Sequence, residues 1–403
     1  METRPLEGIR IIEMASHGAC PSSTRILTDW GAEVIKIEPF AGDAARGSGM
    51  TFGVPVEEVM NPHFDMLNMG KKSVALNMKT EEGKAVMDKL LRTANALVTN
   101  FRTGSLGRMG LDWEHFHEKY PGLVWAHLSG FGEEGPAAAN AGFDTVAYYA
   151  RSGAMIDFTE NGEAPLSPPF GVGDMSAGSS LAGGIAAALF RQLRTGEGSK
   201  VTISLYGQSI WAHGLIFQGV ANGVRYPKSR RSTRLPLNNT YKCSDGEWLM
   251  ISVLQYDRYF RQFFTTIGRE DLIDDDRFNT MEAAEKNNTE LISIIDEAFR
   301  GKTREEWMKL LKEADIAHDK INHLTDAIED EQALVNGFLY YNDYPDGRRA
   351  MMAMPPVQVG EAVEPKKGTG PALGGDTEDV LTGLGYSREE IEKLVEDGAV
   401  RRS

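Results

Sequence analysis

The chain has 403 residues, of which 41% are hydrophobic and 25% are charged, and its formal net charge is −15. This length exceeds the roughly 250 to 300 residues that one hydrophobic core usually organises, so we expect more than one domain. The acidic charge disfavours nucleic acid and anionic membrane surfaces as partners, and no apolar run approaches the roughly 20 residues that span a bilayer.

The first residues of the chain lack the apolar core of a secretory signal, which leads us to expect a cytoplasmic protein. The two cysteines, Cys20 and Cys243, are too few for a disulfide framework. We therefore expect both to be free thiols.

Short apolar segments alternate with helical segments through the first third of the chain. The predicted strands cover residues 8–15, 32–38, 73–78, 96–101 and 122–129, and the predicted helices cover 21–30 and 81–94. Pro21 and Thr80 stand where helices begin. This alternation predicts an α/β fold, with a Rossmann-like large domain built on a parallel sheet.

The second half of the chain changes character near residue 225. A helix beginning near Asp174, a strand over 200–205 and a helix over 206–223 precede the change. A hairpin turning at Asp245-Gly246 and polar helices to about Ala327 follow it, which predicts a smaller α+β domain. We expect domain segments at 1–224, 225–334 and 335–403, the last ending in two helices with a capping box from Ser387 to Glu390.

Several motifs are weak evidence for other chemistry. The segment "GFGEEG", Gly130 to Gly135, fits the dinucleotide fingerprint, but two glutamates would repel a pyrophosphate and Pro136 poorly continues a helix. The chain has no Walker loop and no Gly-x-Ser-x-Gly elbow. His115 and His117 lack the spacing and the neighbouring ligands of a metal site, so we predict no metal.

Asp174 lies in "GVGDMSAGSS", between a Gly-x-Gly run and a helix of small residues. Aspartate favours the start of a helix, so Asp174 is interpreted first as an N-cap. A carboxylate at a glycine-rich junction is also able to attack a carbonyl group beside backbone donors for an oxyanion. Gly171, Gly173, Ala177 and Gly178 would leave room for an acyl group, and the residue pattern leaves both interpretations open.

Six motifs in this order resemble those of the family III CoA-transferases, the CaiB/BaiF type. They are "LEGIRIIEMASHGACPSSTRILTDWGAEVIKIEPFAGD", "NMGKKSVALNMKTEEGK", "NFRTGSLGRMGLDWE", "SGFGEEGP", "GVGDMSAG" and "PALGGDTEDVLTGLGY". The resemblance runs nearly from end to end. Within the family, "GFDTVAYYARSGAM" and "YPDGRRA" are most similar to the phenyllactate and 2-hydroxyisocaproate CoA-transferases.

The resemblance implies that Asp174 is the catalytic carboxylate and that Asp144 is a second active-site group. Asp174 would carry the acyl group as an anhydride and CoA as a thioester. Coenzyme A would be a substrate, with no tightly bound cofactor, and its contacts fall on a list of six residues: His17, Gly18, Lys71, Asn100, Phe101 and Arg108. A small inserted domain and an interlocked homodimer are implied as well.

The expected reaction moves CoA from an acyl-CoA to a free monocarboxylic acid, with a 2-hydroxy, branched or aryl acid favoured. The apolar residues expected near the site are Phe143, Tyr148, Tyr149, Met155, Trp211 and Phe217. Two alternatives are weighed. The related 2-methylacyl-CoA racemases carry Gly-His-Asp where this chain has Gly142-Phe143-Asp144, and phenylalanine cannot accept a proton. A non-catalytic acyl-CoA-binding protein would have no need of Asp174.

Overall fold

The structure is a computed structural model that describes residues 4–360 and 365–403. It divides into two compact units, one within Met1–Gly153, Pro168–Phe217 and Glu331–Ser403 and the other within Ala154–Ser167 and Gln218–Asp330. Compared with the domain segments expected from the sequence, residues 154–167 and 218–224 belong to the smaller unit, and residues 331–334 belong to the larger one.

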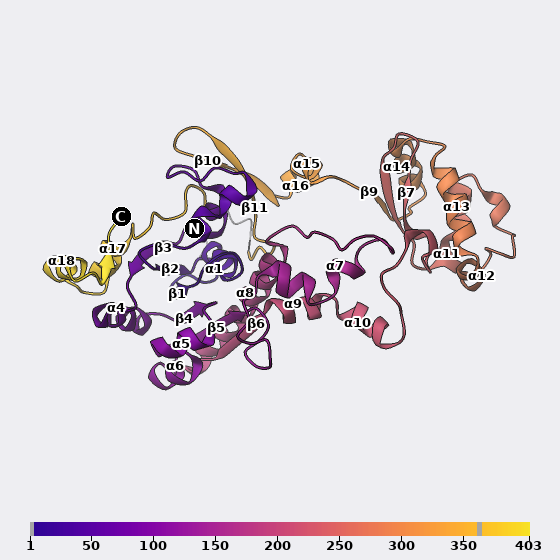
Figure 1. Cartoon of the computed structure of the whole chain (residues 1–403). Helices are drawn as coiled ribbons and strands as arrows, with labels where there is room; N and C mark the ends of the chain where they lie inside the picture. Colours follow the sequence, from indigo (N-terminus) through magenta and orange to yellow (C-terminus); the bar gives the residue numbers. More distant parts are fainter. Residues whose placement is uncertain (1–3, 361–364) are drawn as a thin grey trace. The chain divides into compact units, whose positions relative to one another are not determined.

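The larger unit is built on a seven-stranded sheet with the order β12-β3-β2-β1-β4-β5-β6 (Figure 1). Its strands are β1 (Arg10–Met14), β2 (Glu33–Glu38), β3 (Lys72–Leu76), β4 (Ala96–Thr99), β5 (Val124–Ser129), β6 (Lys200–Ser204) and β12 (Val400–Arg401). All pairings are parallel except that of β12 with β3. The order from β3 to β6 is that of the Rossmann fold, so the predicted α/β class is confirmed.

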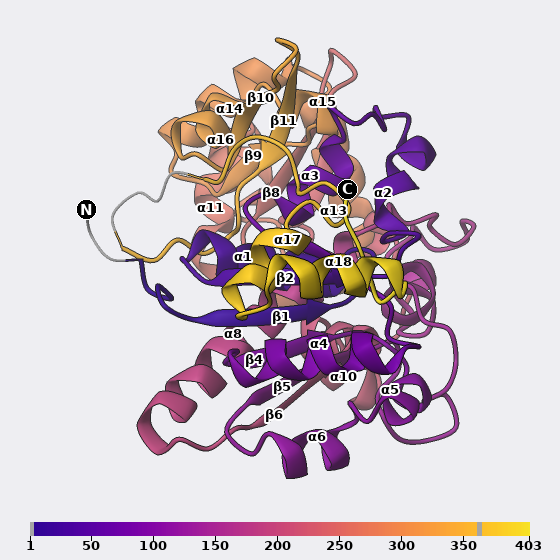
Figure 2. The same ribbon diagram turned by 90° about the vertical axis from the view of Figure 1, so that its left-hand side faces the viewer.

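Helices cover both faces of this sheet because successive side chains of each strand point to opposite faces. Ile11 of β1 belongs to a core with helices α1 (Ala19–Asp29) and α8 (Val172–Thr195). The next residue, Ile12, belongs to a second core, whose helices are α4 (Glu81–Arg92), α5 (Thr103–Met109), α6 (Trp113–Lys119), α17 (Thr377–Gly383) and α18 (Arg388–Glu396). Figure 2 shows α4, α17 and α18 in front of the strands.

Local signals in the sequence placed several helix ends correctly. The Thr80 side chain accepts a hydrogen bond from Gly83 N at 3.0 Å and caps α4. Ser387 and Glu390 form the predicted capping box of α18. The predicted helix over 206–223 is wrong as one element, because it consists of α9 (Leu205–Ala212) and α10 (Gly214–Ala221), separated at His213.

The larger unit also contains elements that the sequence analysis did not predict. They are α2 (Ala45–Ser48), η1 (Gly49–Phe52), α3 (Pro62–Asn68), a π-helical segment η2 (Thr145–Ala150), α16 (Glu331–Val335), and the antiparallel pair β10 (Leu339–Asp343) and β11 (Arg349–Ala353). Segments η1, α3 and η2 matter most here, because each contributes side chains to the cavity described below.

The smaller unit has its own apolar core. Its sheet consists of β7 (Asn238–Lys242), β8 (Trp248–Ser252) and β9 (His318–Lys320), and the hairpin between β7 and β8 turns where it was predicted. Its helices are α7 (Ala154–Asp157), α10, of which residues 218–221 lie here, η3 (Arg230–Ser232), α11 (Tyr256–Thr266), η4 (Glu270–Leu272), α12 (Met281–Lys286), α13 (Asn288–Phe299), α14 (Arg304–Glu313) and α15 (Leu324–Ala327). Trp307 and Phe263 are fully buried in this core.

Three global features bear on function. Within residues 4–360 and 365–403, no helix combines the length and the apolar character needed to cross a membrane. The same residues contain no group of three or more His, Cys, Asp or Glu side chains placed to hold a metal ion. Cys20 and Cys243 are both buried and free, as predicted.

Candidate active site

Asp174 lies in the first turn of α8, three residues after the helix cap. The cap is Gly171, whose φ of 88° is the left-handed conformation that favours glycine. The N-cap interpretation of Asp174 is therefore wrong. Asp144 takes that part instead, because its buried Oδ2 accepts hydrogen bonds from Gly171 N at 2.7 Å and from Gly173 N at 3.2 Å.

Two of the glycines around Asp174, Gly173 and Gly178, allow close packing rather than open space. A Cβ atom on Gly173 would lie 2.7 Å from Cγ of Tyr148 and 2.9 Å from Cβ of Asp144. A Cβ atom on Gly178 would clash with Ser22 Oγ and lie 2.7 Å from the carbonyl oxygen of Ala19. Gly173 and Gly178 thus let η2 and α1 approach α8 closely and leave no room for an acyl group. A Cβ atom on Gly171 would meet nothing within 4 Å, and Gly171 lines a cavity beside Asp174, so the expectation of room for an acyl group holds at this glycine alone.

Gly18, the residue before α1, lies close to the Asp174 carboxylate. A Cβ atom on Gly18 would lie 2.5 Å from Oδ2 of Asp174. The first N–H groups of a helix have no partner within it, and no side chain caps α1. The electropositive N-terminus of α1 therefore borders the carboxylate.

The Asp174 carboxylate is half-buried, and no residue in the described part of the chain donates a hydrogen bond to it. Burial, together with the negative charge of Asp144, raises the pKa of Asp174 to about 7. A carboxylate that gives up its proton near neutral pH and lacks hydrogen-bond donors is more nucleophilic than a solvated one.

Asp174 opens onto a cavity of about 760 Å³, called here the aspartate cavity. Most of its lining is aromatic, aliphatic or backbone. Its larger side chains come from η1, α3, the segments just before η2 and α8, and the first turn of α8, namely Phe52, His63, Met66, Leu67, Phe143, Phe170, Val172 and Met175. His17 and Phe143 meet edge to face in its wall, with ring centroids 5.5 Å apart.

Two further cavities continue from the aspartate cavity along the carboxyl ends of the strands. The middle cavity, of about 440 Å³, shares His17 and Phe143 with the aspartate cavity and contains Asn100 and Phe101. The cationic cavity, of about 800 Å³, shares Phe101 with the middle cavity. Rossmann-type sheets bind ligands at this edge, where the strand order reverses between β1 and β4.

The structure brings five of the six predicted CoA contacts to this row of cavities. His17 and Gly18 line the aspartate cavity, Asn100 and Phe101 line the middle cavity, and Arg108 lines the cationic cavity. The side chain of Arg108 is exposed and donates to Ser105 Oγ at 2.9 Å. These residues lie up to 91 positions apart in the sequence and meet because β1 and β4 are adjacent in the sheet.

Lys71 does not lie where it was expected. Its ammonium group is buried and donates to Glu13 Oε2 at 2.7 Å, to the carbonyl oxygen of Pro21 at 2.9 Å and to Asn68 Oδ1 at 3.0 Å. All three of its hydrogen atoms are engaged, so none is free for a phosphate. The prediction that Lys71 contacts CoA is therefore wrong.

Lys79 and Lys84 were missed by the sequence analysis and line the cationic cavity together with Arg108. The Thr80 cap could have indicated them, because it marks the start of α4. Lys79 directly precedes this cap, and Lys84 lies in the first turn of the helix. Lys84 also pairs with Glu81 at 2.7 Å, on an exposed surface where such a pair contributes little.

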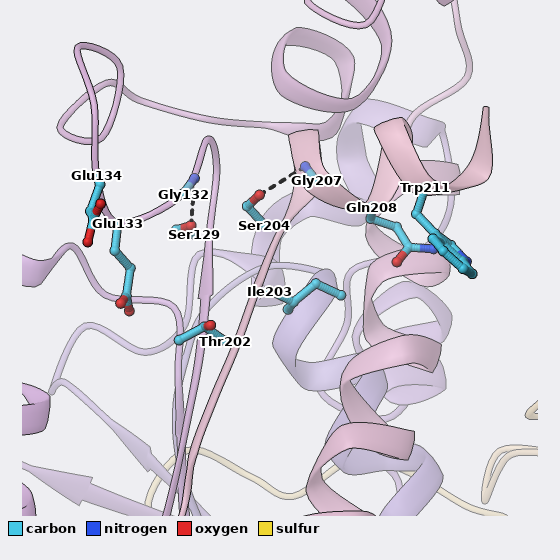
Figure 3. Close-up of a pocket in the computed structure, with 10 residues that line it drawn as sticks. All are labelled: Ser129, Gly132, Glu133, Glu134, Thr202, Ile203, Ser204, Gly207, Gln208 and Trp211. Carbon is cyan, nitrogen blue, oxygen red and sulfur yellow. Dashed lines mark hydrogen bonds between the residues drawn. The ribbon is translucent and has the colours of Figure 1, made fainter. Parts of the chain in front are cut away.

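Of the six apolar residues expected near the site, Phe143 lines the aspartate cavity and the other five do not. Tyr148 is buried behind Gly173, and Met155 belongs to the smaller unit. Trp211 lines a different cavity, of about 650 Å³, at the ends of β5 and β6 (Figure 3).

The "GFGEEG" segment also borders the cavity lined by Trp211, and no helix begins at its end. Its Gly132 N donates to Ser129 Oγ at 3.0 Å (Figure 3). Glu133 accepts a contact from Lys200 at 2.6 Å and one from His127 at 2.6 Å. Because its acidic side chain is engaged with cations of the protein, the segment has the character of a structural loop and not of a pyrophosphate cradle.

The fold and the site define an α/β protein with a Rossmann strand order, a poised carboxylate in an apolar cavity and a row of cavities ending in cationic side chains. The family model for CoA-transferase family III matches residues 6–377. The chain therefore belongs to CoA-transferase family III, and its enzyme class is that of the CoA-transferases. This assignment favours the transferase over the racemase and the binding protein weighed above.

Two curated relatives match nearly the whole chain. The (R)-2-hydroxy-4-methylpentanoate CoA-transferase of Clostridioides difficile is 38% identical over 98% of this chain and 99% of its own length. The cinnamoyl-CoA:phenyllactate CoA-transferase of Clostridium sporogenes is 38% identical over 98% and 97%. Among solved structures, a CaiB/BaiF family protein from Brucella suis has a TM-score of 0.78 and 26% identity, covering 95% of this chain and 100% of its own.

Proposed function

We propose that this protein transfers CoA from an acyl-CoA to a 2-hydroxy monocarboxylic acid with a branched or aryl side chain, and that Asp174 carries both groups in turn. The observation that supports this most directly is the position of Asp174. Its carboxylate borders an apolar cavity and the N-terminus of α1, and it has no hydrogen-bond donor among the described residues.

The proposed chemistry has four steps, each of which forms one bond to an acyl carbon and breaks another. An Asp174 oxygen attacks the donor thioester carbonyl, which forms an anhydride and releases CoA thiolate. The thiolate attacks the Asp174 carboxyl carbon, which forms an aspartyl-CoA thioester and releases the donor acid. The acceptor carboxylate displaces the thiolate to form a second anhydride, and the thiolate then attacks the acceptor carbonyl. The products are the new acyl-CoA and free Asp174.

The row of cavities matches the chemistry of a bound acyl-CoA. Arg108, Lys79 and Lys84 supply positive charge for phosphates in an otherwise acidic protein. The aromatic ring of Phe101 lies where the cationic and middle cavities meet and can pack against an adenine or the pantetheine chain. The thioester would then reach Asp174 past His17 and Phe143.

The lining of the aspartate cavity supports an apolar acid. Phe52, Phe170 and Phe143 offer aromatic surface, and no Lys or Arg lines the cavity among the described residues. A second carboxylate there would remain unpaired, which costs several kcal/mol, whereas each buried methylene gains about 0.8 kcal/mol. The two relatives at 38% identity are named for 2-hydroxy acids with an isobutyl or a benzyl side chain.

The test is a comparison of kcat/KM for phenyllactate, 2-hydroxy-4-methylpentanoate, oxalate and succinate with one common acyl-CoA donor. We expect either 2-hydroxy acid to be preferred at least tenfold over either dicarboxylate. Preference for a dicarboxylate by the same factor would overturn the proposed substrate class and leave the family assignment intact. Absence of transfer to every acid would contradict the proposed activity.

Replacing Arg108 with alanine is expected to raise KM for acyl-CoA about tenfold while kcat changes less than about threefold. A hydrogen bond to a charged group contributes about 1.5–3 kcal/mol. Arg108 and Asp174 line different cavities, so the phosphate contact should stabilise the ground state and the transition state equally. Steady-state kinetics with varied acyl-CoA measures both constants.

The matched control is Arg388→Ala, which removes an exposed arginine of α18 that pairs with Glu392 at 3.2 Å. It should leave both constants unchanged. A loss confined to kcat in Arg108→Ala would show that Arg108 is not a simple phosphate contact.

The homodimer expected from the resemblance stays a prediction. Several large apolar side chains on α8, α9 and α10 are exposed in the single chain, namely Phe190, Leu193, Trp211 and Leu215. Exposed apolar surface of this kind is typical of an interface between protein chains, which supports the prediction.

A further inference from the structure

The turn between β1 and α1 sets how closely the N-terminus of α1 approaches Asp174. Its middle residue, His17, has a φ of 64°, a left-handed conformation that residues with a Cβ atom rarely adopt. Gly18 then follows, at the position where a Cβ atom would meet Asp174. A turn in this conformation persists only where its surroundings hold it.

Two side chains from other parts of the sheet hold the turn. Asn100, after β4, accepts from Ser16 N at 3.1 Å through Oδ1 and donates to the Ser16 carbonyl oxygen at 2.7 Å through Nδ2. Asp43, after β2, accepts from Ser16 Oγ at 2.6 Å and from His17 N at 3.1 Å, both through Oδ1. Its third bond, from Ala45 N at 2.9 Å, anchors Asp43 to its own loop.

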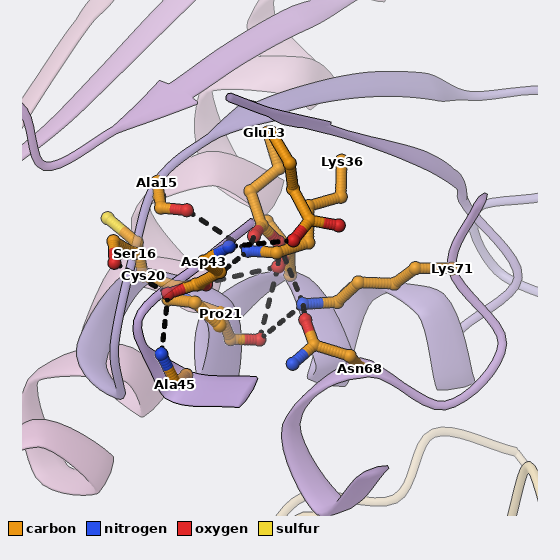
Figure 4. A network of polar contacts seen from close by, with 12 residues as sticks. Glu13, Ala15, Ser16, Cys20, Pro21, Lys36, Asp43, Ala45, Asn68 and Lys71 are labelled. Carbon is orange, nitrogen blue, oxygen red and sulfur yellow. Dashed lines mark hydrogen bonds and ion pairs between the residues drawn. The ribbon is translucent and has the colours of Figure 1, made fainter. Parts of the chain in front are cut away.

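A row of buried charged side chains contacts the carboxylate oxygen of Asp43 that does not bond the turn (Figure 4). Lys36 Nζ lies 2.7 Å from Asp43 Oδ2 and 2.7 Å from Glu13 Oε1. The other oxygen of Glu13 pairs with Lys71 at 2.7 Å. Two carboxylates thus alternate with two ammonium groups, and the four side chains are at most 1% exposed.

The protonation states agree with this arrangement. Burial by itself would raise the pKa of Asp43, but Lys36 and the hydrogen bonds from Ser16 and Ala45 lower it below its ordinary value. Asp43 is therefore an ionised acceptor at neutral pH. Buried ion pairs are weak evidence for stability, because the loss of hydration offsets the attraction between the charges. This row of buried ion pairs ends at Asp43, which holds the turn beside Asp174. We therefore interpret it as a device that positions the turn.

We propose that Asp43 is a positioning residue, which holds the Ser16–His17–Gly18 turn so that the first N–H groups of α1 face Asp174 and the oxygen of the reacting acyl group. This inference rests on the proposed function of Asp174. Asp43 lines none of the three cavities of the site, so it does not touch the reacting groups. It acts on the reaction through the residues that it holds, which are Ser16 and His17 of the turn and Ala45 of its own loop.

The test compares Asp43→Ala, Asp43→Asn and Ser16→Ala by steady-state kinetics. Asp43→Ala leaves Ser16 Oγ and His17 N without their acceptor, and we expect kcat to fall about 100-fold, the loss that a displacement of about 1 Å produces. KM for acyl-CoA should stay within threefold. Asp43→Asn keeps the Oδ1 acceptor and should recover kcat to within about tenfold of the natural enzyme. Ser16→Ala removes a single hydrogen bond and should lower kcat about fivefold.

The matched control is Asp29→Ala. Asp29 is also buried, lies at the other end of α1 and pairs with Arg25 at 3.0 Å. It should lower the midpoint of thermal unfolding and leave kcat within twofold. Loss of kcat in Asp29→Ala equal to that in Asp43→Ala would overturn the proposal, since general destabilisation would then explain both.

Asp174→Asn, assayed in parallel, separates this inference from the proposed function. If Asp174→Asn is inactive while Ser16→Ala and a folded Asp43→Ala keep kcat within twofold, the positioning role is wrong and the nucleophile stands. If Asp174→Asn transfers CoA at the natural rate, the proposed function itself fails. If Asp43→Ala does not fold, the kcat of Ser16→Ala and Asp43→Asn decides the proposal.

Discussion

Substitution of Asp174 by asparagine is expected to lower CoA transfer by at least about 10⁴-fold, the scale of loss seen when an enzyme loses its nucleophile. The amide has nearly the shape of the carboxylate, so the contact with Gly18 and the packing of α8 should persist. The amide cannot form the anhydride, because its oxygen lacks the negative charge that attacks the thioester.

The measurement is the transfer of CoA between two acids, followed by mass spectrometry of the thioesters. Binding of CoA, measured by calorimetry, should stay within a few-fold, because Arg108 and the lysines of the cationic cavity are unchanged. Transfer at more than about 1% of the natural rate would contradict a covalent role for Asp174.

The pH dependence of the stability of Asp174→Asn tests the raised pKa of Asp174. The pKa of Asp174 in the folded chain is raised to about 7, first by burial and then by Asp144. Below about pH 3 the carboxyl is protonated in the folded and unfolded chain alike, so the variant gains nothing. As pH rises toward 7, the unfolded chain ionises first and the natural protein loses stability relative to Asp174→Asn, by at most about 4 kcal/mol.

Thermal unfolding should therefore show a stabilised Asp174→Asn variant, with a difference at pH 8 at least about twice that at pH 5. An equal difference at both pH values would mean that the carboxylate has an ordinary pKa. It would leave the nucleophile in place but remove the argument that burial prepares it for attack.

Substitution of Gly18 by alanine is expected to lower kcat about 100-fold in a protein that remains folded. The new Cβ atom would lie 2.5 Å from Oδ2, 3.1 Å from Cβ and 3.2 Å from Cγ of Asp174. The backbone of Gly18, with φ of −95° and ψ of −56°, is one that alanine adopts freely. The flexible Asp174 side chain must therefore rotate, which removes it from the N-terminus of α1.

The measurement is kcat together with the unfolding midpoint, and the control is Gly383→Ala at the exposed end of α17, where a Cβ atom meets nothing within 4 Å. The control should keep full activity. If Gly18→Ala is as active as the control, the close approach of the turn to Asp174 has no part in catalysis.

Local patterns in the sequence predicted the α/β class and the chain order of strands β1 to β6 in the larger unit. Short apolar strands, the Thr80 cap and the Ser387–Glu390 box are local signals, and they are confirmed because neighbouring residues alone produce them. The family resemblance, carried by motifs along the whole chain, is confirmed by the match over residues 6–377. The role of Asp174 was inferred from the same resemblance and stays a proposal.

The surroundings of Asp174 depend on contacts between distant parts of the chain. Asp144 caps α8 from 27 residues away, and Lys71 lies against Glu13, 58 residues distant, so no local pattern indicates either contact. The same holds for the wall of the aspartate cavity, where Phe52 and Phe170 meet with ring centroids 5.6 Å apart. Contacts between distant residues depend on which strands pair and how closely helices pack. Patterns among neighbouring residues do not report these features, so they cannot predict the contacts.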